Sequence, residues 1–252
     1  MFPVIRIASL TIQARGLILL IAFWLASSAA ERAAKRLGLR GDDVYNLGFY
    51  GIVAGLLGAR LGYVIQYGSV YQNDLGAIFA LNLNTLSPVA GVLAAFAVAY
   101  GYARRKGIAD RRLLDALTPG LIVFAAGLAL ADLASGDGYG APAQLPWSID
   151  LWGELRHPTQ MYHLLAAIGI GVVVWRSSRP FDGARFGLFA ALYAASRLLL
   201  GAFHGDSATF AGVRVVQLWS LVALVAALVL LRRWAGERME DTITATATST
   251  HR

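Results

Sequence analysis

The chain has 252 residues, of which 57% are hydrophobic and 15% charged, and its mean hydropathy is +0.57. A soluble domain has about 45–50% apolar and about 25% charged residues, so this composition excludes an ordinary soluble protein. The chain contains no cysteine, which excludes disulfides and thiolate chemistry from its own side chains, so a reacting thiol must come from a substrate. Its formal net charge is +7. Most of its basic residues are grouped in loops between apolar runs, so the chain has no soluble basic face that could bind nucleic acid.

Seven apolar runs follow one another along the chain, and a helix needs about 20 such residues to cross a bilayer. The runs cover residues 7–30, 44–67, 86–103, 113–134, 159–175, 186–203 and 213–231. We therefore expect an all-α, polytopic membrane protein with seven transmembrane helices. Residues 1–239 should form a single transmembrane domain. The Thr-rich segment 240–252 should be a disordered cytoplasmic tail.

Lysine and arginine are concentrated in alternate loops. They follow the first, third, fifth and seventh runs, whereas residues 68–85 and 205–212 contain none. The positive-inside rule then places the N-terminus outside and the C-terminus in the cytoplasm. The longest polar segment between two runs, residues 132–163, should face outward. Because loops held by a rigid scaffold often carry function, this segment is the candidate site.

Glycine recurs at helical spacing in the second run. The positions are Gly48, Gly51, Gly55, Gly58 and Gly62. Small residues let helices approach closely in lipid, where association depends on van der Waals fit. We interpret this stripe mainly as a packing surface, with a functional role as the weaker alternative.

Two arginines, Arg60 and Arg197, lie inside apolar runs. An arginine at the bilayer centre costs at least about 2.5–3.5 kcal/mol, so each should face a polar interior or an anionic partner. The alternative is that each extends toward the interface and pairs with a carboxylate such as Asp132. Arg15 and Arg214 lie nearer the ends of their runs, where a structural role is favoured.

The outward segment contains acids among glycines and one histidine at the start of a run. Asp132 ends the fourth run, and Asp137 stands in residues 136–140, Gly-Asp-Gly-Tyr-Gly. Such glycines favour constrained turns whose N–H groups can approach an oxyanion, although a plain turn that carries an acid fits equally well. His157 precedes Pro158, a residue suited to a helix start. It is either a structural hydrogen-bonding group or part of a site.

Arginines converging from different helices, with a histidine and two carboxylates at the outer rim, would suit an anionic headgroup that enters from the bilayer. A phospholipid phosphate is the natural candidate. The cations would stabilise charge on a phosphate leaving group, and a carboxylate or histidine could take a proton from the nucleophile.

Five motifs resemble, in chain order, those of the prolipoprotein diacylglyceryl transferase family. They are Gly-Ala-Arg-Leu-Gly-Tyr-Val at 58–64, Gly-Asp-Gly-Tyr-Gly at 136–140 with Leu-Pro-Trp at 145–147, Arg-His-Pro-Thr-Gln-Met-Tyr at 156–162, Leu-Tyr-x-x-x-Arg at 192–197 and Gln-Leu-Trp-Ser at 217–220. The third of these is the most specific.

The resemblance implies a multi-pass enzyme of the bacterial inner membrane with an extracytoplasmic site. Such an enzyme moves diacylglyceryl from phosphatidylglycerol to the lipobox cysteine in the signal peptide of a prolipoprotein, without a metal or cofactor. The catalytic residues expected here are Arg60, Asp132, Asp137, His157 and Arg197. The residues expected to bind substrate are Arg15, Gly62, Tyr63, Gly136, Gly140, Arg156, Gln160, Tyr162 and Gln217.

Several family polar groups are replaced. Ala129 stands where the family has an arginine and Asp132 where it has an asparagine, while Val89 and Gly201 replace a histidine and a glutamate. One interpretation is a divergent transferase in which Arg15 or Arg214 supplies the missing cation. The alternatives are a paralogue that binds anionic phospholipid without chemistry, and a transferase that acts on another acceptor.

Overall fold

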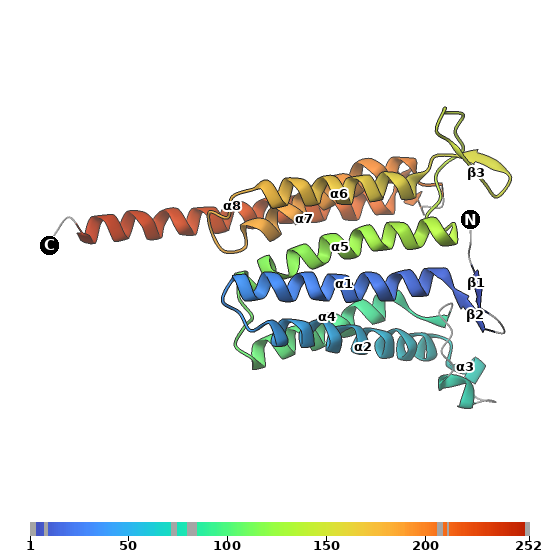
Figure 1. Ribbon diagram of the computed structural model, residues 1–252, viewed down its shortest axis with the longest axis horizontal. Coiled ribbons are helices and arrows are strands. Elements are labelled where there is room, and N and C mark those ends of the chain that lie inside the picture. The colour runs from blue at the N-terminus through green and yellow to red at the C-terminus, as the bar shows by residue number, and fades with distance from the viewer. Residues whose placement is uncertain are drawn as a thin grey trace.

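The structure, a computed structural model, describes residues 4–7, 10–71, 75–79, 85–205, 209–210 and 212–249. It is mostly helical, and its long helices lie side by side along the long axis of the molecule (Figure 1). They are α1 (Ala14–Arg36), α2 (Gly41–Gln66), α4 (Pro88–Arg105), α5 (Arg111–Ser135), α6 (Thr159–Arg176), α7 (Ala184–Leu200) and α8 (Val215–Ser249). Two short helices, α3 (Gly68–Tyr71) and the 3-10 helix Leu75–Phe79, follow α2.

Among the described residues, five helices are long and apolar enough to cross a membrane, namely α1, α2, α5, α7 with its 3-10 extension to Phe203, and α8. Each of the other two, α4 and α6, has 18 residues and lies alongside these five (Figure 1). An 18-residue helix is about 27 Å long, close to the thickness of the hydrocarbon layer. The protein therefore has several membrane-spanning helices, and the count of seven stays a prediction.

Short strands, which the all-α prediction did not include, lie at one end of the helical bundle. β1 (Val4–Ile7) pairs with β2 (Leu10–Gln13), and β3 (Ile149–Leu151) pairs with β4 (Glu154–Arg156), both antiparallel. β5 (Thr209–Phe210) pairs with β6 (Val213–Arg214) just before α8. Because β-branched residues are frequent in 4–13, extended structure wins there, and the first helix begins at Ala14 rather than near residue 7.

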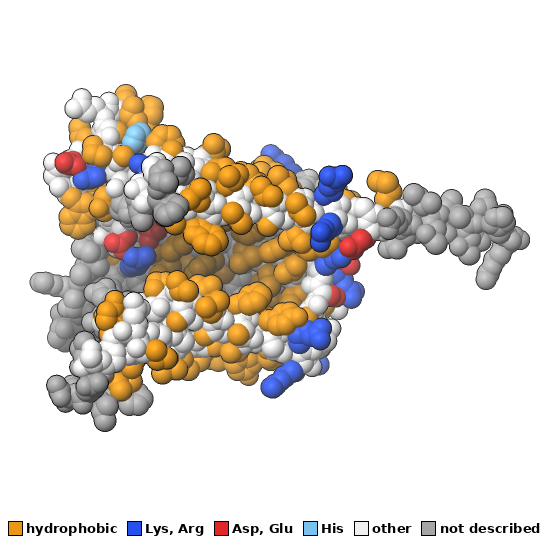
Figure 2. Space-filling view, turned by 180° about the vertical axis from the view of Figure 1, so that it is seen from behind, with side chains coloured by type: hydrophobic (Ala, Val, Ile, Leu, Met, Phe, Trp, Pro, Cys, Tyr) orange, Lys and Arg blue, Asp and Glu red, His pale blue; other side chains and the backbone are white. Residues whose placement is uncertain are grey.

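The C-terminal helix is longer than the sequence predicts. α8 continues to Ser249 and projects beyond the other helices (Figure 1), so residues 240–249 are helical where we expected disorder. Extending an existing helix needs no new nucleus, which removes the most costly step of helix formation. Lys and Arg side chains gather at the end of the molecule from which α8 projects (Figure 2), which is the distribution on which the predicted orientation rests.

Small residues bring the helices together. α1 packs along α5, where a Cβ on Gly127 would lie 2.2 Å from Cβ of Ala22. α2 packs along α4 in the same way, and a Cβ on Gly58 would lie 2.3 Å from Cβ of Ala94. α5 also contacts α6 and α7, and α7 packs on α8. The hairpin end of α5 thereby lies beside the starts of α1 and α6 and the end of α7.

Candidate functional site

The outward segment begins where α5 ends. Gly136 terminates the helix in the left-handed region with φ of 81°, and Gly138 has φ of 59°. Side chains with a Cβ adopt these angles at a cost, so glycine suits both positions of the turn. The constrained turns predicted for residues 136–140 are therefore present at these two positions.

Arg15, at the start of α1, joins the two acids of this turn. Its Nη2 lies 3.1 Å from Oδ1 of Asp132, and its Nη1 donates to Oδ2 of Asp137. Ser135 Oγ donates a second hydrogen bond to Asp137 Oδ2, at 2.9 Å. Three residues predicted for the site thus meet, although we had expected Asp132 to pair with Arg60 or Arg197 if these were structural.

The same turn is held to the first residues of α6. Gln160 Nε2 donates to the carbonyl oxygen of Asp137 at 2.8 Å, and Thr159 Oγ1 donates to that of Gly138 at 2.6 Å. Both side chains are buried, and Gln160 is only 2% exposed. Gln160 Oε1 is buried and has no hydrogen-bond partner among the described residues. Gln160 therefore positions the turn through its amide nitrogen.

A second polar cluster joins Arg197 of α7 to two histidines. The Nε2 atoms of His163 and His204 lie 2.8 Å apart, and Arg197 Nη1 lies 3.4 Å from His163 Nε2. Our sequence analysis did not select either histidine. The available signal was weak: His163 follows the most specific motif by one residue, and His204 follows the sixth apolar run by one residue.

Gly138 lies between the two clusters. A Cβ placed on it would be 3.7 Å from Oδ2 of Asp132 and 4.0 Å from Cε1 of His204. Backbone bonds fix this proximity: Gly205 N donates to the carbonyl oxygen of Tyr139 at 3.0 Å, and Gly140 pairs with His204 as an isolated bridge. The described contacts therefore assemble one polar site from the ends of α1, α5, α6 and α7.

His157 lies in an aromatic group rather than beside either acid. Its Nδ1 is 3.3 Å from the hydroxyl of Tyr162, which accepts a hydrogen bond from Trp147 Nε1 at 2.8 Å. The ring of Phe203 lies 5.0 Å from that of His157. The backbone of His157 also approaches Gly140, where a Cβ would be 2.3 Å from the carbonyl oxygen of His157. Gly140 is therefore needed for close packing of the loop.

Arg156 contacts several other residues of the loop and holds them together. It pairs with Glu154, lies 4.9 Å over the ring of Tyr139, and donates to the carbonyl oxygen of Gly140 at 3.3 Å. Nη1 and Nη2 therefore both have partners, whereas the buried Nε has none among the described residues.

Arg60 belongs to a different cluster. Its guanidinium donates to the carbonyl oxygens of Ile78 at 2.8 Å and Thr85 at 3.0 Å, and also to that of Ala77. Its Cζ lies 5.4 Å from the ring of Tyr71. None of these contacts involves Arg197, so the structure does not bring the two arginines onto one partner.

Gly62 and Tyr63, also expected to bind substrate, lie in the packed part of α2. A Cβ on Gly62 would be 2.2 Å from Cβ of Ala90 on α4, and the ring of Tyr63 lies 4.5 Å from that of Tyr67. For Gly62 the packing interpretation of the glycine stripe is the one that fits the structure.

The two predicted compensating cations have different positions. Arg214 donates to the carbonyl oxygens of Gly201, at 2.8 Å, and Ala202, so it caps the end of α7. Gln217 Nε2 lies 3.4 Å from the carbonyl oxygen of Leu198, and its Cγ would be 3.1 Å from a Cβ on Gly201. Of the two arginines, Arg15 is the one beside Asp132 and the turn. Within the described ranges, no three acids or histidines lie close enough to hold a metal ion.

Comparison with known proteins tests the resemblance seen in the motifs. A family model described as prolipoprotein diacylglyceryl transferase matches residues 3–233, nearly the whole chain. The chain belongs to this family. Because the family consists of diacylglyceryl transferases, the enzyme class expected from the motifs is confirmed.

Named relatives in this transferase family cover most of the chain. The phosphatidylglycerol–prolipoprotein diacylglyceryl transferase of Clostridioides difficile is 26% identical, over 85% of this chain and 87% of that protein. Those of Geobacter sulfurreducens and Bordetella parapertussis are 30% and 29% identical, over 81% and 88% of this chain and 82% and 90% of theirs.

Proposed function

We propose that this transferase moves diacylglyceryl from phosphatidylglycerol to the thiol of a lipobox cysteine in a prolipoprotein. The family match and the names of its relatives support this substrate pair. The observation that carries the proposal is a set of connected contacts: Arg15 meets Asp132 and Asp137 at the glycine turn, and Arg197 is linked to the same turn through His163 and His204. The thiol belongs to the substrate, since this chain has no cysteine.

We also propose seven spans, an outside N-terminus and a site at the extracytoplasmic face of the bacterial inner membrane, within one membrane domain. The parallel course of α4 and α6 supports the span count (Figure 1), and the alternating basic loops support the orientation. The space-filling view shows the surface hollowed along its middle between rows of hydrophobic side chains (Figure 2). A lipid can reach the site laterally through such an opening.

Arg197 is the residue best placed to hold the phosphate. Among the described residues, its side chain contacts no carboxylate, and its single hydrogen-bond partner is Nε2 of His163. Its charge is therefore available to an anion, and a guanidinium binds two phosphate oxygens at once.

Arg15 has a different task. It pairs with two carboxylates that would otherwise repel each other and the phosphate, and one of them, Asp132, lies three residues after Ala129, which stands where the family has an arginine. Asp137, half-exposed at the turn, can accept hydrogen bonds from the glycerol hydroxyls of the headgroup.

The histidine pair is better suited than His157 or Asp137 to take the thiol proton. We assign the tautomers from Arg197, which can only donate: His163 Nε2 then accepts, and His204 Nε2 carries the hydrogen shared by the pair. On this assignment we give the proton-accepting role to His204 Nδ1. A neutral imidazole is an effective general base near neutral pH, whereas Asp137 is engaged by Arg15.

The proposed reaction is a single displacement. The thiol proton moves to His204 Nδ1, the sulfur forms a bond to the glyceryl carbon next to the phosphate oxygen, and that carbon–oxygen bond breaks. Arg197 stabilises the departing glycerol phosphate, and the imidazolium returns the proton to it or to water. The products are an S-diacylglyceryl thioether and glycerol phosphate, so atoms and charge balance.

Complementation tests the activity. The gene should rescue growth of a strain depleted of its own diacylglyceryl transferase and should shift the mobility of a reporter prolipoprotein. Arg197→Ala should abolish both effects, whereas Arg104→Ala, an exposed change at the other end of the bundle, should not. Failure of the wild-type chain, when it is shown to be inserted, would favour the paralogue that binds anionic phospholipid or an altered acceptor.

Kinetics of the purified enzyme test the base. His204→Gln should lower the rate of thioether formation by about 10²–10⁴-fold, the usual contribution of a general base. Added imidazole should restore part of the rate in His204→Ala. His157→Gln is the matched control, since the side chain of His157 hydrogen-bonds only Tyr162 among the described residues, and it should change the rate little. The opposite ranking would assign the proton transfer to His157.

A further inference from the structure

A cavity of about 380 Å³ lies at the end of the bundle remote from the turn, between α1, α5, α6 and the segment that joins α6 to α7. Its polar lining consists mainly of four arginines, Arg32, Arg36, Arg179 and Arg185. Small-molecule sites commonly have volumes of about 300–1,000 Å³, so this one can hold a headgroup. None of its lining residues belongs to the transferase site described above.

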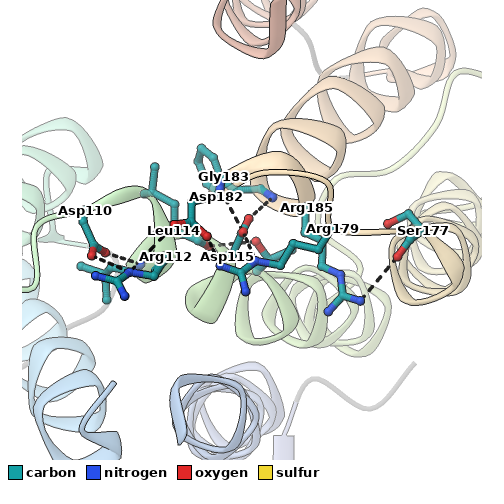
Figure 3. Close-up of polar contacts among 12 residues, drawn as sticks. Asp110, Arg112, Leu114, Asp115, Ser177, Arg179, Asp182, Gly183 and Arg185 are labelled. Atoms are coloured by element: carbon teal, nitrogen blue, oxygen red, sulfur yellow. Dashed lines mark hydrogen bonds and ion pairs between the residues drawn. The ribbon is translucent and has the colours of Figure 1, made fainter. Parts of the chain in front are cut away.

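Asp115 is the acid in this lining, and its charge is already engaged. It is 3% exposed, and its Oδ2 accepts from Arg179 Nε at 2.8 Å and from Gly183 N at 2.9 Å. Its Oδ1 accepts from Phe186 N at 3.0 Å, so Asp115 caps the start of α7 (Figure 3). Arg179 also pairs with Asp182, and both of its contacts are therefore structural.

The other three arginines have no acidic partner among the described residues. Arg32 and Arg36 are exposed and make no side-chain hydrogen bond or ion pair with any described residue. Arg185 donates only to the carbonyl oxygen of Ser177, at 3.4 Å, and its Nε is buried without a hydrogen-bond partner among the described residues. A buried donor without an acceptor is unfavourable, so the cavity presents three positive charges and one N–H group that needs an acceptor.

Most of the remaining lining is apolar. Ile122 and Val174 form part of the wall, and Trp175 is 82% exposed at the edge, where an indole suits the interface between lipid and water. A free phosphate would need no such wall. An acyl chain that leaves a bound headgroup would lie against it.

We propose that this cavity binds an anionic phospholipid of the cytoplasmic leaflet, with its phosphate held by Arg32, Arg36 and Arg185. The leaflet follows from the proposed orientation. Basic pockets between membrane helices on this side are suited to anionic headgroups, and guanidinium groups match phosphate oxygens. The bound lipid would hold α1 against α6 and is separate from the lipid consumed in the reaction.

Native mass spectrometry of the purified full-length protein, titrated with phosphatidylglycerol, tests this site. The wild type should retain two lipids, one in each site. The variant Arg32→Gln/Arg36→Gln/Arg185→Gln should retain one, because each arginine near a membrane surface contributes about fivefold in affinity. The control Arg104→Gln/Arg105→Gln/Arg176→Gln removes three exposed charges that do not line the cavity and should still retain two.

Equal retention in the triple variant and its control would overturn the proposal. If the triple variant fails to fold, Arg32→Gln/Arg36→Gln, which removes two exposed side chains, should weaken the second lipid by about 25-fold. Equal binding of phosphatidylcholine would show that charge is not recognised, and displacement by millimolar inorganic phosphate would assign the cavity to a soluble anion. Transferase activity should persist in every variant, so the outcome is independent of the proposed reaction.

Discussion

Arg15 and Arg197 show how two identical side chains at the same end of the bundle acquire different roles from their neighbours. Arg15 pairs with Asp132 and Asp137, so its charge is balanced by the protein itself. Arg197 contacts the neutral His163, and no carboxylate among the described residues offsets it. An incoming phosphate is therefore attracted to Arg197, while Arg15 maintains the geometry of the turn.

Replacing Arg15 should separate activity from stability. In Arg15→Gln the two carboxylates lose their shared cation, so phosphatidylglycerol should bind more weakly and transferase activity should fall about tenfold or more. The free energy of unfolding should change by only about 0–1 kcal/mol, because the ion pairs are partly exposed. Activity assays and thermal unfolding in detergent measure the two effects.

A second change serves as an internal check on this explanation. Adding Asp137→Asn to Arg15→Gln removes the repulsion and should recover part of the activity. Lys35→Gln, which breaks the exposed pair with Glu31 at the remote end, should alter neither quantity. Full activity of Arg15→Gln would show that Arg15 has no part in the site.

At the scale of elements, the close packing of α2 against α4 depends on glycines, which have no Cβ atom. Cβ atoms on Gly58 and Gly62 would lie 2.3 Å and 2.2 Å from alanine Cβ atoms of α4, well inside contact distance. The helices therefore approach as closely as their backbones allow, which is the main source of attraction between helices in lipid. This packing supports the segment to which Arg60 is hydrogen-bonded.

Gly58→Ala should force these helices apart. We expect it to lower the free energy of unfolding by about 1–3 kcal/mol, the usual cost of overpacking, with a lower midpoint of thermal unfolding. Gly101→Ala is the matched control on α4, since a Cβ there meets no atom within 4 Å. It should be neutral or stabilising because alanine is the better helix former. The pair Gly58→Ala/Ala94→Gly should restore stability; continued loss would point to another cause.

For the whole molecule, the orientation decides which leaflet each site faces. The chain has no cysteine, so single cysteines can be introduced without altering native ones. Gln144→Cys, exposed at the turn end, should react with a membrane-impermeant maleimide in intact spheroplasts. Ser178→Cys, exposed at the other end, should react only after permeabilisation. The reverse pattern would invert the topology and move both sites to the opposite leaflets.

Much of the architecture could be predicted because hydrophobic runs have a length that the bilayer imposes. Each predicted run coincides with one of the long helices, and most helix ends lie within a few residues of the run ends; α8, which continues to Ser249, is much longer than its run. At the start of the first run, a segment rich in β-branched residues forms β1 and β2 instead of helix. The β-branched residues favoured strands there, but the high hydrophobicity of the segment led us to predict a helix.

The site was harder to predict than the helices. Arg15 and Asp137 are 122 positions apart, and His163 and His204 are 41 apart, so no local pattern indicates that they meet. Arg197 was selected because an intramembrane cation is costly, yet its partner proved to be a histidine rather than Asp132. His157 was selected from a motif, and the structure places it among aromatic rings.

The sequence by itself determined that this is a multi-pass membrane protein of the diacylglyceryl transferase family, because apolar run length and motif order are properties of the linear chain. Only the tertiary structure decided which arginine meets which acid and that two histidines touch. It also decided that three arginines, with no acidic partner in the described part of the chain, line a cavity at the remote end. Those outcomes depend on the rotation and depth at which helices pack. Small residues along each interface set both, through contacts between segments distant in sequence.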